Sequence, residues 1–171
     1  MSIRQRLYPT SYDEVMLRTH GDHARFIYNL AVIQRSYCDK AVRARGGLVT
    51  YNTQARELTA LRAEYDWLRA GASAVQQDAL RDADRAFKNF FESCSDNRAG
   101  VRVGFPKLKR KGNELSFTVR IGNGLRRINK KYGEILVPKL GYVKFRITRL
   151  WSDICSAKSA RITFKNQQWH V

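Results

Sequence analysis

The sequence has 171 residues, of which 43% are hydrophobic and 11% aromatic, enough for one ordinary domain or two small ones with a packed core. This composition excludes an intrinsically disordered chain. The formal net charge of +17 opposes compaction through self-repulsion. Such a charge indicates a polyanionic partner: DNA, RNA or an anionic membrane surface.

Positive charge is concentrated in the second half of the chain. Residues 1–96 hold 14 Lys or Arg and 12 Asp or Glu, whereas residues 97–171 hold 18 and 3. A single basic run is commonly a solvated surface, but a half-chain with so few acids predicts contacts to phosphate groups. We therefore expect a nucleic-acid-binding protein whose later half carries most of the binding charge.

The cysteines and the apolar segments indicate the cellular compartment. Cys38, Cys94 and Cys155 lie far apart without a CxxC pair, so we expect buried free thiols in a reducing cytosol, with neither a disulfide framework nor a zinc site. The first residues lack the apolar core of a signal peptide, and no stretch approaches the roughly 20 apolar residues that span a bilayer. We expect a soluble intracellular protein with no membrane partner.

The first part of the chain predicts a strand and then a helix. Residues 3–8 alternate in polarity and precede a proline, which predicts a strand. The capping-box pattern at residues 11–14 opens a helix whose apolar period continues to about residue 45. Gly21 is expected to divide this helix into a short and a long part, and Gly46–Gly47 to end it.

Two further helices follow in the sequence. Asn52 or Thr53 can cap the first of them, and Ser73 can cap the second, which extends to about Cys94. Steps of three and four residues predict one buried face on the second helix. This face comprises Leu80, Ala83, Phe87 and Phe90.

After about residue 96 the helical period stops and short β segments separated by turn residues begin. The predicted strands are residues 115–121, 134–137, 142–147 and 161–164, with another starting at 167. Such spacing predicts a small barrel or a curled sheet. Because the sequence stops as its last strand begins, we expect that a natural continuation is missing.

Three groups of basic residues are candidate phosphate contacts. Residues 103–111 place four cations within five positions beside Phe105 and Pro106, and Arg126–Arg127 with Lys130–Lys131 form a second cluster. The third group could line one basic face of the strands, with Phe117 and Tyr142 available for stacking on bases. Its cations are Arg120, Lys144, Arg146 and Arg149.

The helix that starts at Ser73 carries a polar stripe. Ser73, Gln77, Arg81 and Lys88 are separated by steps of four and seven residues, which place them beside the apolar face. Gln and Arg are side chains that read base edges, and a helix fits the major groove. Many surface helices carry such a stripe, so spacing alone leaves a solvated face as the alternative.

The sequence predicts no intrinsic active site. His20, His23 and His170 have no Cys or carboxylate at metal-ligand spacing, and no nucleophile, phosphate-loop or zinc-protease motif occurs. A two-metal nuclease needs converging carboxylates. The acids of the second half are isolated from one another: Glu114, Glu134 and Asp153.

Seven short segments over nearly the whole chain carry a further signal. They are Arg6–Pro9, Ala24–Asn29, Leu58–Arg62, Trp67–Leu68, Ala86–Phe91, Gly104–Lys107 and Val137–Gly141. Their content and order resemble the N-terminal region, wedge plus recognition lobe, of TnpB/OrfB-type transposon-encoded RNA-guided nucleases. These proteins are relatives of the type V CRISPR effectors.

The resemblance implies an α+β fold in which a small oligonucleotide-binding-like β-barrel, the wedge, is interrupted by a helical recognition insertion. The wedge would comprise residues 1–10 and 97–171, and the recognition domain residues 11–96. In the family these parts hold the guide-RNA scaffold and the guide–target heteroduplex, and they read a short DNA motif beside the target. The implied partners are a guide RNA and double-stranded target DNA, in a prokaryotic cytoplasm near the nucleoid.

The resemblance also implies roles for individual residues. Positions that match the family's motif-reading sites are Tyr51, Ser73, Gln77, Arg81 and Asn123. We expect a larger basic set to bind RNA or phosphate. This set is Arg6, Arg25, Lys88, Lys107, Lys109, Arg110, Lys111, Arg126, Arg127, Lys130, Lys131 and Lys144.

The resemblance stops short of the family's catalytic part. Family members continue into a RuvC-like nuclease domain with three acidic metal ligands and a zinc-binding insertion, and nothing in this sequence matches these. We therefore expect no catalytic residue, no metal ligand and no cofactor in these residues, with Mg²⁺ needed only by a nuclease domain. One alternative is a stand-alone sequence-specific DNA-binding remnant or repressor that uses the front helices as a helix-turn-helix. The other is one subunit of a split nuclease, whose RuvC-like domain lies on a separate chain or a second protomer.

Overall fold

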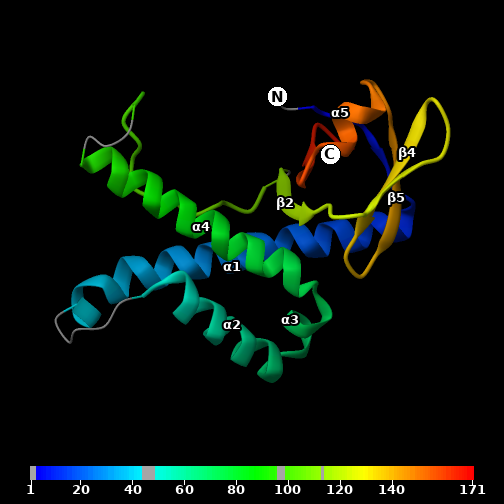
Figure 1. The fold of residues 1–171 in the computed structure, drawn as a ribbon. Coiled ribbons are helices and arrows are strands. Elements are labelled where there is room, and N and C mark those ends of the chain that lie inside the picture. Colours follow the sequence, from blue (N-terminus) through cyan, green and yellow to red (C-terminus); the bar gives the residue numbers. More distant parts are fainter. Residues whose placement is uncertain (1–2, 44–48, 96–98, 113) are drawn as a thin grey trace.

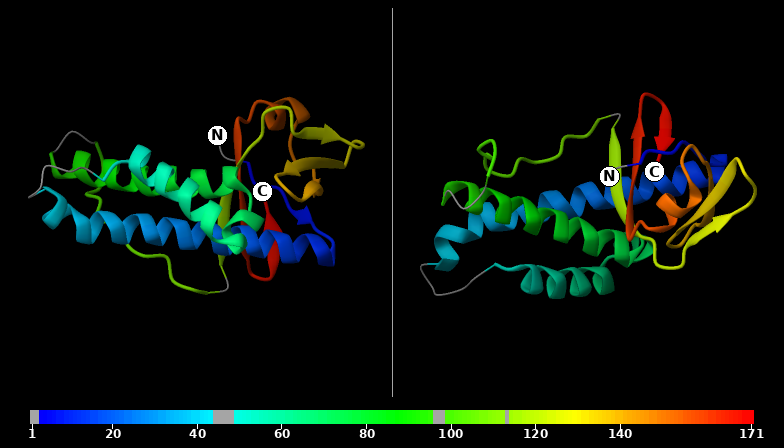
Figure 2. Two further views of the ribbon diagram at one scale, coloured as in Figure 1. Left: turned by 90° about the horizontal axis from the view of Figure 1, so that it is seen from below. Right: turned by 45° about the horizontal axis from the view of Figure 1, so that its top comes forward.

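A computed structural model describes residues 3–43, 49–95, 99–112 and 114–171 of the chain. The helices are α1 (Ser11–Arg43), α2 (Tyr51–Glu64), α3 (Asp66–Ala70), α4 (Ser73–Cys94) and α5 (Trp151–Cys155). The strands are β1 (Leu7–Tyr8), β2 (Leu115–Arg120), β3 (Leu125–Arg127), β4 (Tyr132–Val137), β5 (Gly141–Arg146), β6 (Ser159–Lys165) and β7 (Gln168–His170). The long helices α1, α2 and α4 lie alongside one another, and the strands gather around the N-terminal half of α1 (Figures 1 and 2). The predicted α+β class is confirmed.

The strands form two antiparallel sheets, in the orders β1-β5-β4-β3 and β2-β6-β7. The residues before β1 join them: the Gln5 N–H donates to the Val171 carbonyl at 2.7 Å, and the Val171 N–H donates to the Gln5 carbonyl at 2.8 Å. Arg6 and His170 form an antiparallel bridge beside these bonds. The start of the chain is therefore bonded to both sheets. The described strands do not close into a barrel, so the predicted barrel is not confirmed.

Helix α1 is unbroken over 33 residues, so the break predicted at Gly21 is wrong. Gly21 is buried, and a Cβ at this position would lie 3.0 Å from the Cβ of Leu115 in β2. The glycine therefore allows β2 to lie close against the helix, and packing in the folded protein outweighs the low helix propensity of glycine. The helix end predicted at Gly46–Gly47 lies outside the described residues, as does the predicted domain boundary at 96/97.

The helix caps differ from those predicted by one to three residues. Thr10, rather than Ser11, caps α1: the Asp13 N–H donates to Thr10 Oγ1 at 3.2 Å, and the Thr10 N–H donates to Asp13 Oδ2 at 2.8 Å. Thr50, rather than Asn52 or Thr53, caps α2. Helix α4 begins at Ser73 without a side-chain cap, and it ends at Cys94 as predicted.

Helices α1 and α4 pack against each other, and both carry small buried side chains. Ala24 and Ala31 of α1 and Ala79 and Ala83 of α4 are buried, and close approach of two helix backbones increases the dispersion contacts of the larger side chains around them. The predicted apolar face of α4 is confirmed, with its outer member Phe90 only partly buried.

The β region follows the predicted segments with local differences. Strands β2, β4, β5 and β6 overlap the predicted segments, with ends that differ by one or two residues, and β7 forms as expected. The first strand is shorter than predicted, Leu7–Tyr8 instead of residues 3–8, while β3 and α5 had no counterpart in the prediction. Cys94 and Cys155 are free but exposed, so their predicted burial is wrong; the side chain of Cys38 lies outside the described part. In the described helices no segment is long and apolar enough to cross a membrane.

Candidate nucleic-acid interface

Three of the five predicted motif-reading residues meet where α2 begins and α4 passes it. The Tyr51 hydroxyl donates to Gln77 Oε1 at 3.0 Å, and the guanidinium carbon of Arg81 lies 5.5 Å from the centre of the Tyr51 ring. Gln77 and Arg81 are one turn apart on α4, which brings both within reach of the one tyrosine. The side chain of Arg81 is about half exposed, so donors remain available to a ligand.

A carboxylate that the sequence reasoning missed holds this group in place. Asp78 is 3% exposed, and its Oδ1 accepts from Arg81 at 2.7 Å. Arg120 of β2 donates to both oxygens of the same carboxylate, over 3.0 to 3.2 Å. These hydrogen bonds and the charge of Asp78 raise the pKa of Arg120. Two half-exposed cations thus share one buried anion, and the group keeps a net positive charge.

A second ion pair repeats the arrangement one turn further along α4. Asp82 accepts from Arg161 of β6 at 3.0 Å. The acids Asp78 and Asp82 are four residues apart, so they lie on one face of the helix and meet neighbouring strands of one sheet. The spacing of these two acids beside the apolar stripe was the signal in the sequence. The pairs fix the position of α4 on the β2-β6-β7 sheet.

The other two predicted motif-reading residues stand apart from this group. Ser73 is exposed at the start of α4, one turn before Gln77. Asn123 is exposed in the turn after β2, three residues beyond Arg120. In the described part of the chain, neither makes a hydrogen bond or an ion pair with Tyr51, Gln77 or Arg81.

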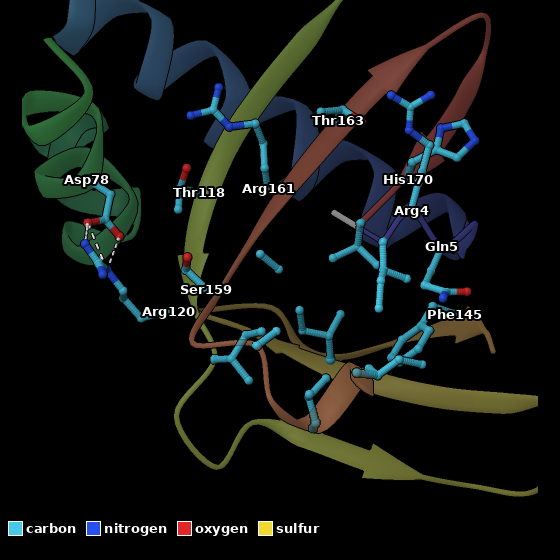
Figure 3. A pocket seen from close by; sticks show the side chains of 18 of the residues that line it. Arg4, Gln5, Asp78, Thr118, Arg120, Phe145, Ser159, Arg161, Thr163 and His170 are labelled. Atoms are coloured by element: carbon cyan, nitrogen blue, oxygen red, sulfur yellow. Dashed lines mark hydrogen bonds and ion pairs between the residues drawn. The ribbon is translucent and has the colours of Figure 1, made fainter. Parts of the chain in front are cut away.

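A cavity of about 660 Å³ opens between α4 and the two sheets, and Asp78 with its partners Arg81 and Arg120 forms part of its lining (Figure 3). Five arginines line it together with apolar side chains of the strands and of α5. The arginines are Arg4, Arg81, Arg85, Arg120 and Arg161. His170 also lines this cavity, and burial together with the nearby charges of Arg4 and Arg6 lowers its pKa.

The basic segment 103–111 divides into inward and outward cations. Lys109 is half-buried: its ammonium lies 4.1 Å from the Tyr28 ring centre, and burial lowers its pKa. Its backbone is bonded to Asn29 of α1, because the Lys109 N–H donates to Asn29 Oδ1 at 2.8 Å and the Asn29 amide donates to the Lys109 carbonyl at 2.9 Å. The cations beside it are exposed and available to phosphates. They are Lys107, Arg110 and Lys111.

The basic face predicted for the strands is only partly assembled. Arg120 lies in the other sheet and binds Asp78, and Phe117 is 3% exposed in the core, so neither shares a face with Lys144. Tyr142 is half-exposed, with the guanidinium carbon of Arg126 3.1 Å from its ring centre. Arg146 is exposed on the same strand as Lys144, and Arg149 lies in the following loop.

The remaining predicted phosphate contacts differ in their surroundings. Arg25 forms an ion pair with Asp22 at 2.9 Å and is mostly buried, while Lys88 is exposed, 3.8 Å from Glu92. Arg127 lies 6.0 Å from the Trp151 ring centre. The other members are exposed at the strand ends and in the β3–β4 turn: Arg6, Lys130 and Lys131.

The histidines have structural partners. His20 Nε2 lies 2.9 Å from the Pro138 carbonyl, and His23 Nδ1 lies 3.3 Å from Gln76 Nε2. Burial lowers the pKa of both rings. Within the described ranges no three His, Cys, Asp or Glu side chains gather as a metal site.

Comparisons with known proteins agree with the order of the sequence motifs. Residues 1–38 match a helix-turn-helix domain family of OrfB proteins of the IS605 type. Over 168 residues, 97% of this chain, the sequence is 25% identical to InsQ of Escherichia coli, whose name describes an RNA-guided DNA endonuclease. The chain resembles the N-terminal region of TnpB/OrfB-type proteins. It spans 38% of the length of InsQ.

The match to a helix-turn-helix domain covers β1 and most of α1. In the described residues of this segment, α1 continues from Ser11 without a turn. The part of the chain that this family model matches therefore contains no turn between two helices among its described residues.

Proposed function

We propose that this chain is the nucleic-acid-binding module of a TnpB-like RNA-guided DNA endonuclease. Residues 1–10 and 97–171 form the wedge and residues 11–96 the recognition domain. Together they bind the guide-RNA scaffold, the guide–target heteroduplex and the short DNA motif beside the target. We assign no cleavage step and no cofactor to these 171 residues; Mg²⁺ and the RuvC-like nuclease belong to a further domain, to a partner chain or to a second protomer.

The observation that carries the proposal is the shared carboxylate of Asp78. Arg81 has five N–H donors in a planar fork, and Asp78 occupies one of its nitrogens. A guanidinium fixed in this way needs little reorganisation before it donates to a guanine edge in the major groove. Gln77, fixed by the Tyr51 hydroxyl, can present its amide N–H groups to an adjacent acceptor.

A selection experiment tests the motif-reading part. The chain is bound to the RNA transcribed from beside its own gene, and the complex selects from duplex DNA carrying a matched target and randomised flanking bases. Arg81→Ala should relax the preference at one or more flanking positions by about 1–3 kcal/mol. Lys88→Ala, on an exposed position two turns further along α4, is the matched control and should lower affinity for every sequence alike. An unchanged preference in Arg81→Ala contradicts the assignment of the reading helix.

The RNA part is tested by recovering the chain from its native cells and sequencing the RNA bound to it. One enriched structured RNA from beside the gene is the expected result. Bulk RNA that dissociates at moderate salt would show phosphate attraction alone.

The match of residues 1–38 to a helix-turn-helix domain keeps one rival function in view, a stand-alone DNA-binding repressor. It predicts tight sequence-specific binding to DNA without any RNA. The unbroken α1 speaks against it, because the matched segment has no turn that would present a second helix to the groove.

A further inference from the structure

We propose that the exposed face of the β1-β5-β4-β3 sheet binds unpaired nucleotides of RNA by stacking them on tyrosines. We call it the tyrosine face, defined by Tyr8, Tyr132 and Tyr142 together with Arg6, Arg126 and Lys144. The inference rests on the proposed function, which supplies the RNA, and adds a binding site to it.

The strand register places these side chains on one face. Tyr8 pairs with Lys144, Lys144 pairs with Glu134, and Glu134 pairs with Arg126, which makes one row across the four strands. Tyr142 and Tyr132 lie two residues from this row on β5 and β4, so they point to the same side. The alternate residues are buried on the opposite side of the sheet. These are Leu7, Ile135, Val137, Val143 and Phe145.

Each tyrosine on this face has a cation against its ring. The ammonium of Lys144 lies 4.1 Å from the Tyr132 ring centre, and the guanidinium carbon of Arg126 lies 3.1 Å from that of Tyr142. The guanidinium of Arg6 lies 5.4 Å from the Tyr8 ring, and Tyr8 and Tyr132 meet edge to face at 6.1 Å. Tyrosine rings and cations therefore alternate on this face. The rings can stack on bases, and the cations can bind the phosphates that link one base to the next.

Charge on the face points to a polyanion. Exposed Arg146 extends the row of cations on β5, and among the described residues of the face Glu134 is the one acid. An acidic protein could pair with the cations of the face, but its charge alone would not account for the three partly exposed tyrosine rings between them. A duplex presents phosphates but no free base faces, because its bases are stacked on each other. Unpaired nucleotides use both the rings and the cations.

The experiment measures the binding of a short oligoadenylate RNA to the full chain by fluorescence anisotropy, over a series of salt concentrations. A double variant, Tyr132→Leu with Tyr142→Leu, removes two rings and keeps apolar side chains. Its affinity should fall on the order of tenfold or more, since two bases lose their stacking partners. The salt slope should stay unchanged, because no phosphate contact is removed. Tyr132→Phe with Tyr142→Phe should bind nearly as well as the original chain.

Two controls isolate the face. Tyr65→Leu removes a more exposed tyrosine at the end of α2, away from this sheet, and should leave affinity unchanged. Lys144→Met should weaken binding and flatten the salt slope, and it provides a second readout should the double variant unfold. Duplex RNA of the same length should lose no affinity in the double variant, and single-stranded DNA should bind more weakly than RNA.

Unchanged oligoadenylate affinity in the folded double variant would overturn the inference and leave a protein as the occupant of the face. An equal loss for single-stranded and duplex RNA would also overturn it, since stacking on unpaired bases would not be the cause. The double variant could also still bind the RNA from beside the gene as tightly as the original chain does. That result would reject RNA binding by the tyrosine face, while the proposed function would stand. Failure of the original chain to retain that RNA would reject the proposed function instead.

Discussion

Gly21 of α1 lies against Leu115 of β2 so closely that a Cβ on the glycine would be 3.0 Å from the leucine Cβ. This contact joins the long helix to the β2-β6-β7 sheet near the start of the chain. It also explains a residue that the sequence alone places at a helix break. The glycine is a packing position inside a continuous helix.

Replacing Gly21 with Leu should therefore destabilise the protein. Overpacking of this kind costs about 1–3 kcal/mol, which exceeds the gain of about 1 kcal/mol from removing a helical glycine. Chemical denaturation measures the free energy of unfolding. Gly104→Leu is the control, since an added Cβ there meets no atom within 4 Å. Equal stability of the two variants would show that β2 moves away at little cost.

The sequence predicted the elements better than it predicted their contacts. Apolar period and turn residues are local, so α4 ended at Cys94 as expected and four β segments were found. The predicted helix caps were wrong by one to three residues. Several polar residues that can cap a helix stand next to each other at both helix starts, and the sequence does not show that Thr10 and Thr50 are the ones that do so. Strand β3 was missed because its three residues are too short to show a period.

In the candidate site, too, the helix positions could be predicted from the sequence but the contacts between elements could not. The α4 stripe of Gln77 and Arg81 could be read from a helical repeat, but their contact with Tyr51 depends on how α2 packs on α4. Asp78 was missed because an acid on a helix usually belongs to a solvated face, and its burial depends on Arg120, 42 residues away. The four-residue spacing of Asp78 and Asp82 indicates one shared helix face, but it does not show which residues of the later strands pair with them.

Removal of the Asp78 carboxylate should cost more than removal of either of its arginines. Asp78→Ala leaves two cations facing each other at the α4–β2 contact, and we expect a loss of about 1–3 kcal/mol in the free energy of unfolding. Arg120→Ala leaves Asp78 paired with Arg81 and should cost less. Asp66→Ala breaks an exposed pair with Arg69 and should cost at most about 1 kcal/mol. A double-mutant cycle between Asp78 and Arg120 with no coupling would contradict the shared-carboxylate arrangement.

His20 should make stability depend on pH in mild acid. Its ring is fully buried, and Nε2 faces the Pro138 carbonyl and therefore donates, which leaves Nδ1 as a bare acceptor without a partner in the described structure. Protonation would add an N–H where no acceptor lies, and burial lowers the pKa of the ring below its ordinary value near 6.5. Because the unfolded chain then binds more protons than the folded one, stability is complete above about pH 6.5 and decreases as the pH falls below it.

Urea denaturation at several pH values between about 7 and 5 measures this effect. One histidine of this kind contributes at most about 1.4 kcal/mol per pH unit. His23 is shifted in the same direction, so His20→Gln should reduce the pH dependence without abolishing it. An identical pH dependence in His20→Gln and the original chain would show that His20 titrates normally in the folded state.

The cations of residues 103–111 should contribute unequally to the salt dependence of binding. Replacing exposed Lys107, Arg110 and Lys111 with Gln should reduce the slope of log affinity against log salt by about 2 or more, since each phosphate contact contributes about 0.7–0.9. Lys109→Gln should change the slope by far less and lower the stability instead, because its ammonium lies over the Tyr28 ring. Titration of one RNA at several salt concentrations measures the slopes, and denaturation measures the stability. If Lys109→Gln flattened the slope as much as Lys107→Gln did, Lys109 would have to turn outward to reach a phosphate when RNA binds.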